Sequence, residues 1–144
     1  MRTRIETSRL NPRPFELSDV EVPFEWLHDP IVMRFPPTGP DKSPQQTTAR
    51  VAGFIEHQKT HGFSKWLNLD RDSTVAIGDS GLLVLPDYGW VDLGFRLAQS
   101  YWGKGLATEL ASAWVRAAFD KFHLTQLGAF VHPRTLLRSG FLKR

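Results

Sequence analysis

The chain has 144 residues, of which 41% are hydrophobic and 12% aromatic, and this length suits one domain with a single core. Its formal charge of +3 comes from charged residues mixed along the sequence, which excludes a charged tail and does not favour a nucleic-acid partner. Cysteine is absent, so disulfides, thiolate metal sites and a cysteine nucleophile are excluded. No segment is apolar for long enough to cross a bilayer, and we expect a cytoplasmic protein without a membrane partner.

Two helices are predicted in the first half of the chain, on either side of a loop rich in proline and glycine. The first would begin after Ser18 and carry its apolar residues on one face, with Pro23 in its first turns. The second has Ser43 as its cap and Pro44 at its first position, and it should run to about His61 before a glycine ends it.

From residue 63 onward the hydrophobic pattern changes to the alternation of strands. Three antiparallel strands are predicted in succession, at 66–69, from Val75 onward, and from Trp90 to Leu97. A glycine-rich loop then opens an amphipathic helix, and Thr125–Val131 forms a last short strand that could run parallel to the third. An earlier strand holding Asn11 and Pro12 should be short or lie at an edge. The order indicates a mixed α/β sheet.

The segment with a chemical signature is the loop at 101–107, with the sequence Tyr-Trp-Gly-Lys-Gly-Leu-Ala. At the start of a helix, unpaired backbone N–H groups and the helix dipole favour an anion such as a diphosphate. Gly103 and Gly105 let the backbone approach phosphate oxygens, and Lys104 adds positive charge. The loop lacks the glycine pattern of a dinucleotide fold and a Walker Gly-Lys-Ser/Thr. Taken alone, it could also be a turn that only packs helix on strand.

Context comes from two neighbouring segments, 92–97 (Asp-Leu-Gly-Phe-Arg-Leu) and 101–109. Together they resemble the GNAT superfamily of N-acetyltransferases, and more narrowly its ribosomal-protein N-acetyltransferase-like (Rim-type) branch. Further matching pieces follow in the same order along nearly the whole chain: 7–10, 13–15, 29–30, 32–35, 77–78, 81–82 and 130–133.

The resemblance implies the GNAT acyl-CoA N-acyltransferase fold, in which a central, mostly antiparallel sheet is flanked by helices. Its fourth and fifth strands splay apart, and acetyl-CoA lies in the cleft between them. No metal is implied. The resemblance assigns the pantetheine arm to strand backbone and the diphosphate to loop amides. The cofactor-binding residues are then Phe95, Arg96 and Leu97 for the pantetheine, and Trp102, Gly103, Lys104, Gly105, Leu106 and Ala107 for the diphosphate.

Acetyl transfer to an amine requires a base that removes the proton of the attacking nitrogen. Asp92 stands where this branch often carries a glutamate, and we expect it to act as general base, through a water because its side chain is shorter. An ordinary solvent-facing strand carboxylate is the alternative. His132 should shape the end of the fifth strand, whereas His57 and His61 are predicted to lie on an exposed helix face. Trp66 is expected in the core.

The match departs from the family pattern after Pro133. The Asn and the Ser that normally follow have no counterpart, and this hydroxyl is the usual acid for the CoA thiolate. The sequence ends at Arg144, where relatives continue into two further strands, so we expect a single GNAT domain, 1–144, that is incomplete at its C-terminus. Its bare sheet edge would be covered by a missing portion, an omitted segment or a partner chain such as a second copy.

The function expected from these features is transfer of an acetyl group from acetyl-CoA directly to a primary amine, either a protein N-terminus or a small-molecule amine. The alternative is an acyl-CoA-binding module with impaired catalysis.

Overall fold

The computed structural model describes residues 4–34, 38–129 and the backbone of 140–143. It contains one six-stranded sheet whose strands follow one another in chain order. The strands are β1 (Leu10–Pro14), β2 (Lys65–Asp70), β3 (Ala76–Leu85), β4 (Trp90–Leu97), β5 (Gln126–Ala129) and β6 (Gly140–Lys143). Every neighbouring pair is antiparallel except β4 and β5, which are parallel. The predicted mixed sheet is confirmed.

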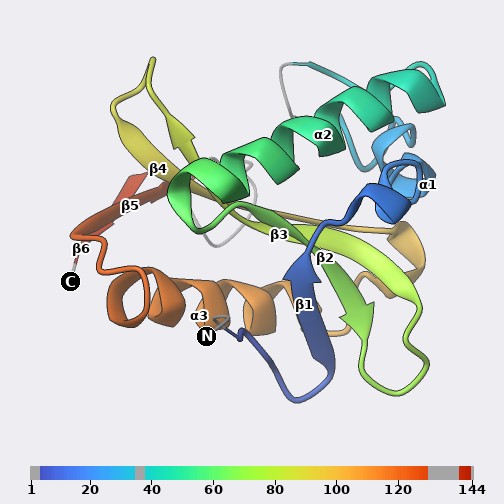
Figure 1. Ribbon diagram of the computed structural model, residues 1–144. Helices are drawn as coiled ribbons and strands as arrows, with labels where there is room; N and C mark the ends of the chain where they lie inside the picture. The colour runs from blue at the N-terminus through green and yellow to red at the C-terminus, as the bar shows by residue number, and fades with distance from the viewer. Residues whose placement is uncertain (1–3, 35–37, 130–139, 144) are drawn as a thin grey trace.

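Helices cover both faces of this sheet, giving three layers (Figure 1). On one face lie α1 (Phe24–Leu27) and the long α2 (Pro44–His61), and on the other lies α3 (Leu106–Asp120). Two short 3-10 turns, η1 (Leu17–Asp19) and η2 (Gln99–Tyr101), connect these elements. One apolar cluster lies between the sheet and α3, and a second lies between the sheet and the layer of α1 and α2. The central strands β2, β3 and β4 are therefore buried between two cores. A parallel connection needs a crossover, and α3 supplies it between β4 and β5.

The helix predictions had different outcomes. For α2 the prediction is confirmed, because the Ser43 hydroxyl accepts from the Gln46 amide at 3.3 Å and the helix ends at Gly62, whose φ is 81°. The predicted start of the first helix is wrong: α1 begins at Phe24, with Pro23 as its N-cap. A proline disfavours helical geometry in the residue before it, so the helix cannot extend back through Val22.

The strand predictions are confirmed for β2, β3 and β4, and β1 lies at a sheet edge as its proline required. An additional strand, β6, was not predicted from the sequence. It has four residues and pairs with the outer edge of β5. A segment this short has too few positions for an alternating pattern to stand out from the surrounding loop.

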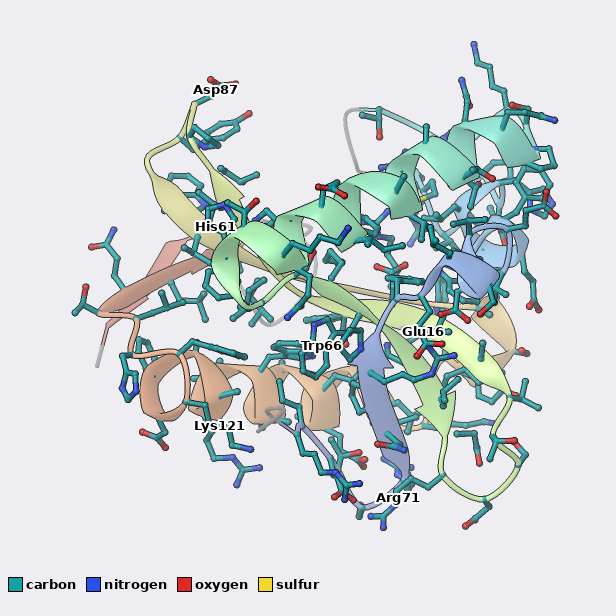
Figure 2. All side chains as sticks on the ribbon, viewed as in Figure 1. Glu16, His61, Trp66, Arg71, Asp87 and Lys121 are labelled. Atoms are coloured by element: carbon teal, nitrogen blue, oxygen red, sulfur yellow. The ribbon has the colours of Figure 1, made fainter. Side chains whose placement is uncertain are left out.

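Beneath α3, three buried polar groups join the helix to the sheet. The indole of Trp114 on α3 donates to the Ser80 hydroxyl on β3 at 2.8 Å, and this hydroxyl donates to the Asn68 carbonyl oxygen on β2 at 2.6 Å. Trp66 packs edge-on against Trp114 and is only 2% exposed, and Figure 2 shows it between the sheet and α3. The prediction that Trp66 belongs to the core is confirmed. Because hydrogen bonds are directional, the series of bonds from Trp114 through Ser80 to Asn68 fixes the rotation of α3 about its axis.

Candidate active site

The glycine-rich loop joins the end of β4 to the start of α3. Gly103 and Gly105 both adopt left-handed backbone conformations, with φ of 76° and 77°, which favour glycine. A Cβ added at Gly103 would meet no heavy atom within 4 Å. Glycine is therefore required here by the backbone conformation and not by lack of space within the protein.

The N–H groups of this loop face no acceptor over most of its length. Within the described part of the chain, the amides of residues 103–107 donate to no backbone or side-chain group, and the N-cap Gly105 offers no side-chain cap. The amide of Trp102 differs, because it donates to the Gln99 carbonyl at 3.0 Å. Trp102 was predicted to offer its amide to the diphosphate, but in this structure that donor is already used. The remaining five amides form the unsatisfied start of α3, where the helix dipole favours an anion.

The edge of β4 that faces β5 is only partly paired. β3 pairs with β4 along eight residues, from Trp90 to Leu97, whereas β5 pairs with it only at Asp92 and Leu93. Among the described residues, no strand pairs with the 94–97 edge on this side. The Leu97 carbonyl accepts from the Trp102 indole at 2.8 Å. The Ala98 amide donates to Ile77 of β3, so by alternation the backbone groups of Arg96 also face β3. The predicted pantetheine contacts therefore fall to Phe95 and the amide of Leu97, and not to the backbone of Arg96.

Side chains of three strands and one helix form a buried charge cluster on the α1/α2 face of the sheet. The Lys65 ammonium lies 3.1 Å from an Asp79 carboxylate oxygen, and the Arg96 guanidinium lies 3.5 Å from the same oxygen. The Trp26 indole donates to the other oxygen at 2.6 Å. Lys65 is 3% exposed and Asp79 is fully buried, so each charge depends on its partners.

Burial and charge act in opposite directions within this cluster. Burial raises the pKa of Asp79, but the charges of Arg96 and Lys65 and the Trp26 hydrogen bond outweigh it and hold that pKa below its usual value. Burial lowers the pKa of Lys65 to about 8, although the Asp79 charge opposes this. The carboxylate is ionised at neutral pH, and it keeps the ammonium mostly protonated.

Asp92 lies next to this cluster. By strand alternation it shares its face of β4 with Gly94 and Arg96, and it is half-buried. A Cβ added at Gly94 would lie 2.9 Å from the Lys65 nitrogen and 3.7 Å from an Asp92 oxygen. The absence of a side chain at residue 94 therefore brings Lys65 and Asp92 close together. Asp92 keeps some exposure to solvent, and its role as general base stays a prediction.

Comparison with known protein families agrees with the geometry of the glycine-rich loop and of β4. Residues 9–136 match the family model of the acetyltransferase (GNAT) domain. This chain belongs to the GNAT family.

Relatives and solved structures of GNAT proteins cover most of this chain. The uncharacterized N-acetyltransferase YoaA of Bacillus subtilis is 27% identical over 147 residues, which cover 96% of this chain and 82% of YoaA. A GNAT acetyltransferase from Bacillus anthracis superposes with a TM-score of 0.78 at 22% identity, over 92% of this chain and 76% of that one. RimL, a ribosomal L7/L12 α-N-protein acetyltransferase in complex with coenzyme A, superposes with a TM-score of 0.71 at 16% identity, over 88% and 73%. The chain is an acetyl-CoA-dependent acetyltransferase, and its structural neighbours include Rim-type enzymes.

The GNAT loop is supported by a residue that the sequence analysis did not assign to the site. Arg9, just before β1, donates through one terminal nitrogen to the Lys104 carbonyl at 2.8 Å and through Nε to Glu109 at 2.9 Å. The two segments are about a hundred positions apart in the sequence, so only their separate resemblance to the family could have suggested the contact.

The histidines predicted to lie on an exposed helix face behave differently from each other. His61 is exposed, whereas His57 is half-buried and accepts the Val84 amide at Nε2 over 3.0 Å. Its Nδ1 lies 2.9 Å from the Phe63 carbonyl, which requires a proton on Nδ1. Burial is the main cause that lowers the pKa of His57. The prediction that His57 lies on an exposed helix face is therefore wrong. The Val84 amide of β3 lies beyond the end of the pairing with β2, and His57 supplies the acceptor that β2 does not.

Three other predictions concern His132 with the segment after it, a metal site and a membrane span. His132 and residues 134–139 lie outside the described residues. Over the described ranges, no group of three or more histidine or acidic side chains is arranged to hold a metal ion. The described helices include none that is both long and apolar enough to span a membrane.

Proposed function

We propose that this protein transfers the acetyl group of acetyl-CoA directly to a primary amine, and that the amides of residues 103–107 bind the diphosphate of the donor. One observation carries the proposal: five successive N–H groups at the start of α3 have no acceptor among the described residues. They directly follow the strand whose pairing with β5 stops after Leu93. A pyrophosphate at this helix start would satisfy these donors and gain from the helix dipole.

The residues around the loop fit such a ligand. The two left-handed glycines carry no side chain that could block a ligand, and the exposed Lys104 between them adds a positive charge. The open edge at Phe95 and Leu97 would pair with the amide groups of the pantetheine arm, as an added strand would. When bound, the acetyl-CoA thioester supplies an activated carbonyl carbon. Lying along this edge, it would face the side of the sheet that carries Asp92.

Asp92 would accept the proton of the attacking amine, through a water molecule because its side chain is short. The Lys65 ammonium lies near this carboxylate, and the charge of Asp92 is one of the causes that oppose the lowering of the Lys65 pKa. We propose that the acceptor is a primary amine, either a protein N-terminus or a small molecule.

Two measurements on the same protein test this function. Titration calorimetry should show binding of coenzyme A, and release of free thiol from acetyl-CoA should depend on an added primary amine, tested with N-terminal peptides and small amines. The lack of the usual Ser after Pro133 favours a second candidate, a catalytically impaired member of the family that acts as an acyl-CoA-binding module. Binding without amine-dependent thiol release would support the module, and absence of binding would reject both.

A further inference from the structure

We propose that Arg9 is the positioning residue of the pyrophosphate loop, because it holds the peptide between Lys104 and Gly105 in the orientation that turns the Gly105 amide outward. This inference rests on the proposed function, since it assumes that the loop binds the diphosphate of CoA. It adds a role for a residue that lies outside the loop, at the start of β1.

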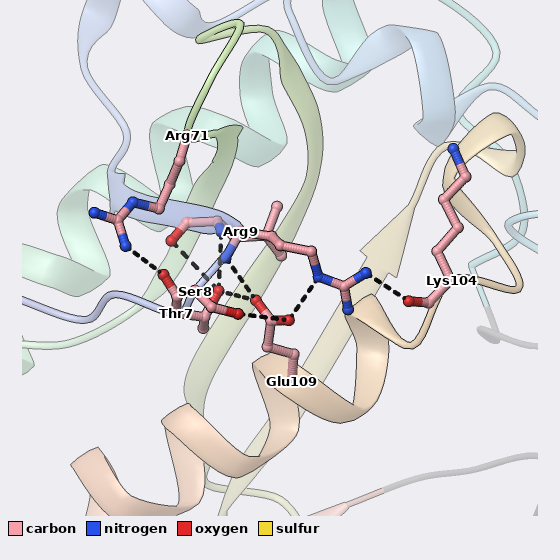
Figure 3. Close-up of polar contacts among 7 residues, drawn as sticks. Thr7, Ser8, Arg9, Arg71, Lys104 and Glu109 are labelled. Atoms are coloured by element: carbon pink, nitrogen blue, oxygen red, sulfur yellow. Dashed lines mark hydrogen bonds and ion pairs between the residues drawn. The ribbon is translucent and has the colours of Figure 1, made fainter.

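The argument begins with the peptide unit itself. The carbonyl of Lys104 and the N–H of Gly105 belong to one planar trans peptide, so they point in opposite directions. Arg9 donates to the Lys104 carbonyl at 2.8 Å (Figure 3). Any contact that fixes the direction of this carbonyl also fixes the direction of the Gly105 amide.

Such a contact matters here because the loop has little intrinsic stiffness. Gly105 has φ of 77° and Gly103 has φ of 76°, and glycine populates positive and negative φ about equally. The peptide before Gly105 could therefore turn over at little cost, and its carbonyl would then face the phosphate site. Arg9 opposes this rotation with a hydrogen bond from a charged donor.

Arg9 is itself held in place by Glu109, in the first turn of α3. The Glu109 carboxylate accepts from Nε of Arg9 at 2.9 Å and from its backbone amide at 3.1 Å, and it also accepts from the Thr7 hydroxyl. Burial raises the pKa of Glu109, but the bonds from Thr7 and Arg9 outweigh burial and lower it. The carboxylate is thus ionised, and Arg9 offsets a negative charge that would otherwise repel a diphosphate at this helix start.

The test compares Arg9→Met with Arg71→Met. Arg71 supports the same N-terminal segment, since it donates to the Thr7 carbonyl at 2.8 Å, but no described contact joins it to the loop. Binding of coenzyme A is measured by calorimetry, folding by the melting temperature, and the Gly105 amide by its 15N-NMR shift during the titration. A charged hydrogen bond contributes enough that Arg9→Met should weaken CoA about tenfold or more and abolish the Gly105 shift, whereas Arg71→Met should change neither.

Other results would overturn the inference. Equal weakening by both variants would mean that the N-terminal segment only supports the fold. Wild-type affinity in folded Arg9→Met would mean that the loop needs no support. Arg9→Lys is a second variant for the case that Arg9→Met does not fold, because lysine keeps the positive charge but not the guanidinium geometry. We expect weaker CoA binding in Arg9→Lys. Full affinity would overturn the inference, because it would mean that only the charge of Arg9 matters. Absence of binding by the wild-type protein would instead reject the proposed function.

Discussion

Replacing Asp79 with asparagine should destabilise the protein more than any other single change in the buried charge cluster. Asparagine keeps the volume, and its amide oxygen can still accept the Trp26 indole, so the main loss is the negative charge. That charge neutralises Lys65 at 3.1 Å and Arg96 at 3.5 Å. Lys65 is 3% exposed, and leaving such a cation without its partner costs about 3–5 kcal/mol of unfolding free energy.

Lys65→Met is the matched variant, because methionine fills the same space without charge. It leaves Asp79 with Arg96 and Trp26, so its cost should be smaller, about 1.5–3 kcal/mol. In Asp79→Asn the lysine can lose its proton, and its pKa, already about 8, falls further, which limits the penalty. The double variant should cost less than the sum of the two singles, since it removes both buried charges.

Urea unfolding at pH 7, followed by tryptophan fluorescence, measures these differences. Equal m-values in the variants would show that the midpoints report stability. Should Lys65→Met cost more than Asp79→Asn, or should Asp79→Asn cost less than about 1 kcal/mol, the assignment of Asp79 as the central partner of a buried ion cluster would be wrong.

Three further predictions concern the site and its surroundings. Gly105→Ala should reduce CoA affinity, because a non-glycine residue at φ of 77° is strained by about 1–2 kcal/mol. The control is Gly53→Ala inside α2, where the added Cβ meets no heavy atom within 4 Å, and this variant should keep its affinity. Equal effects of the two substitutions on CoA binding would contradict the conformational argument. Asp92→Asn should slow amine-dependent thiol release while CoA affinity is retained; full turnover would remove Asp92 as the base. Since the folded state lowers the pKa of His57, this group stabilises the fold fully above its unfolded pKa of about 6.5 and less as pH falls below that value. The melting temperature of the wild type and of His61→Gln should therefore drop between pH 8 and pH 5 more than that of His57→Gln, and identical drops in all three would refute the role of His57.

Local patterns were sufficient to predict the parts of the fold that depend on neighbours in sequence. The cap at Ser43, the left-handed end at Gly62 and the apolar period of α3 each lie within a few residues of the structure that they specify. The glycine loop was predicted for the same reason. Its position between a strand and a helix is visible in the sequence, and the five amides without acceptors follow from that position.

The buried charges were not predictable by the same means. Lys65 lies in a strand, where alternation alone would place a lysine toward solvent, and its burial depends on the register that brings β2 beside Gly81 of β3. The Arg9–Glu109 contact depends on how β1 returns past the start of α3. His57 was misassigned because its partner, the Val84 amide, is left open by the shorter neighbouring strand. Each of these features is set by tertiary pairing, which one sequence does not display.

The hydrogen-bonded chain Trp114–Ser80–Asn68 has a consequence for anyone who redesigns this domain. The apolar residues around it can be exchanged for others of similar volume, since such cores tolerate repacking. These three groups must be kept or replaced together, because a helix freed to turn about its axis would aim its first amides elsewhere. A variant could then melt at its usual temperature and still fail to hold its cofactor, so thermal screening alone would select the wrong designs.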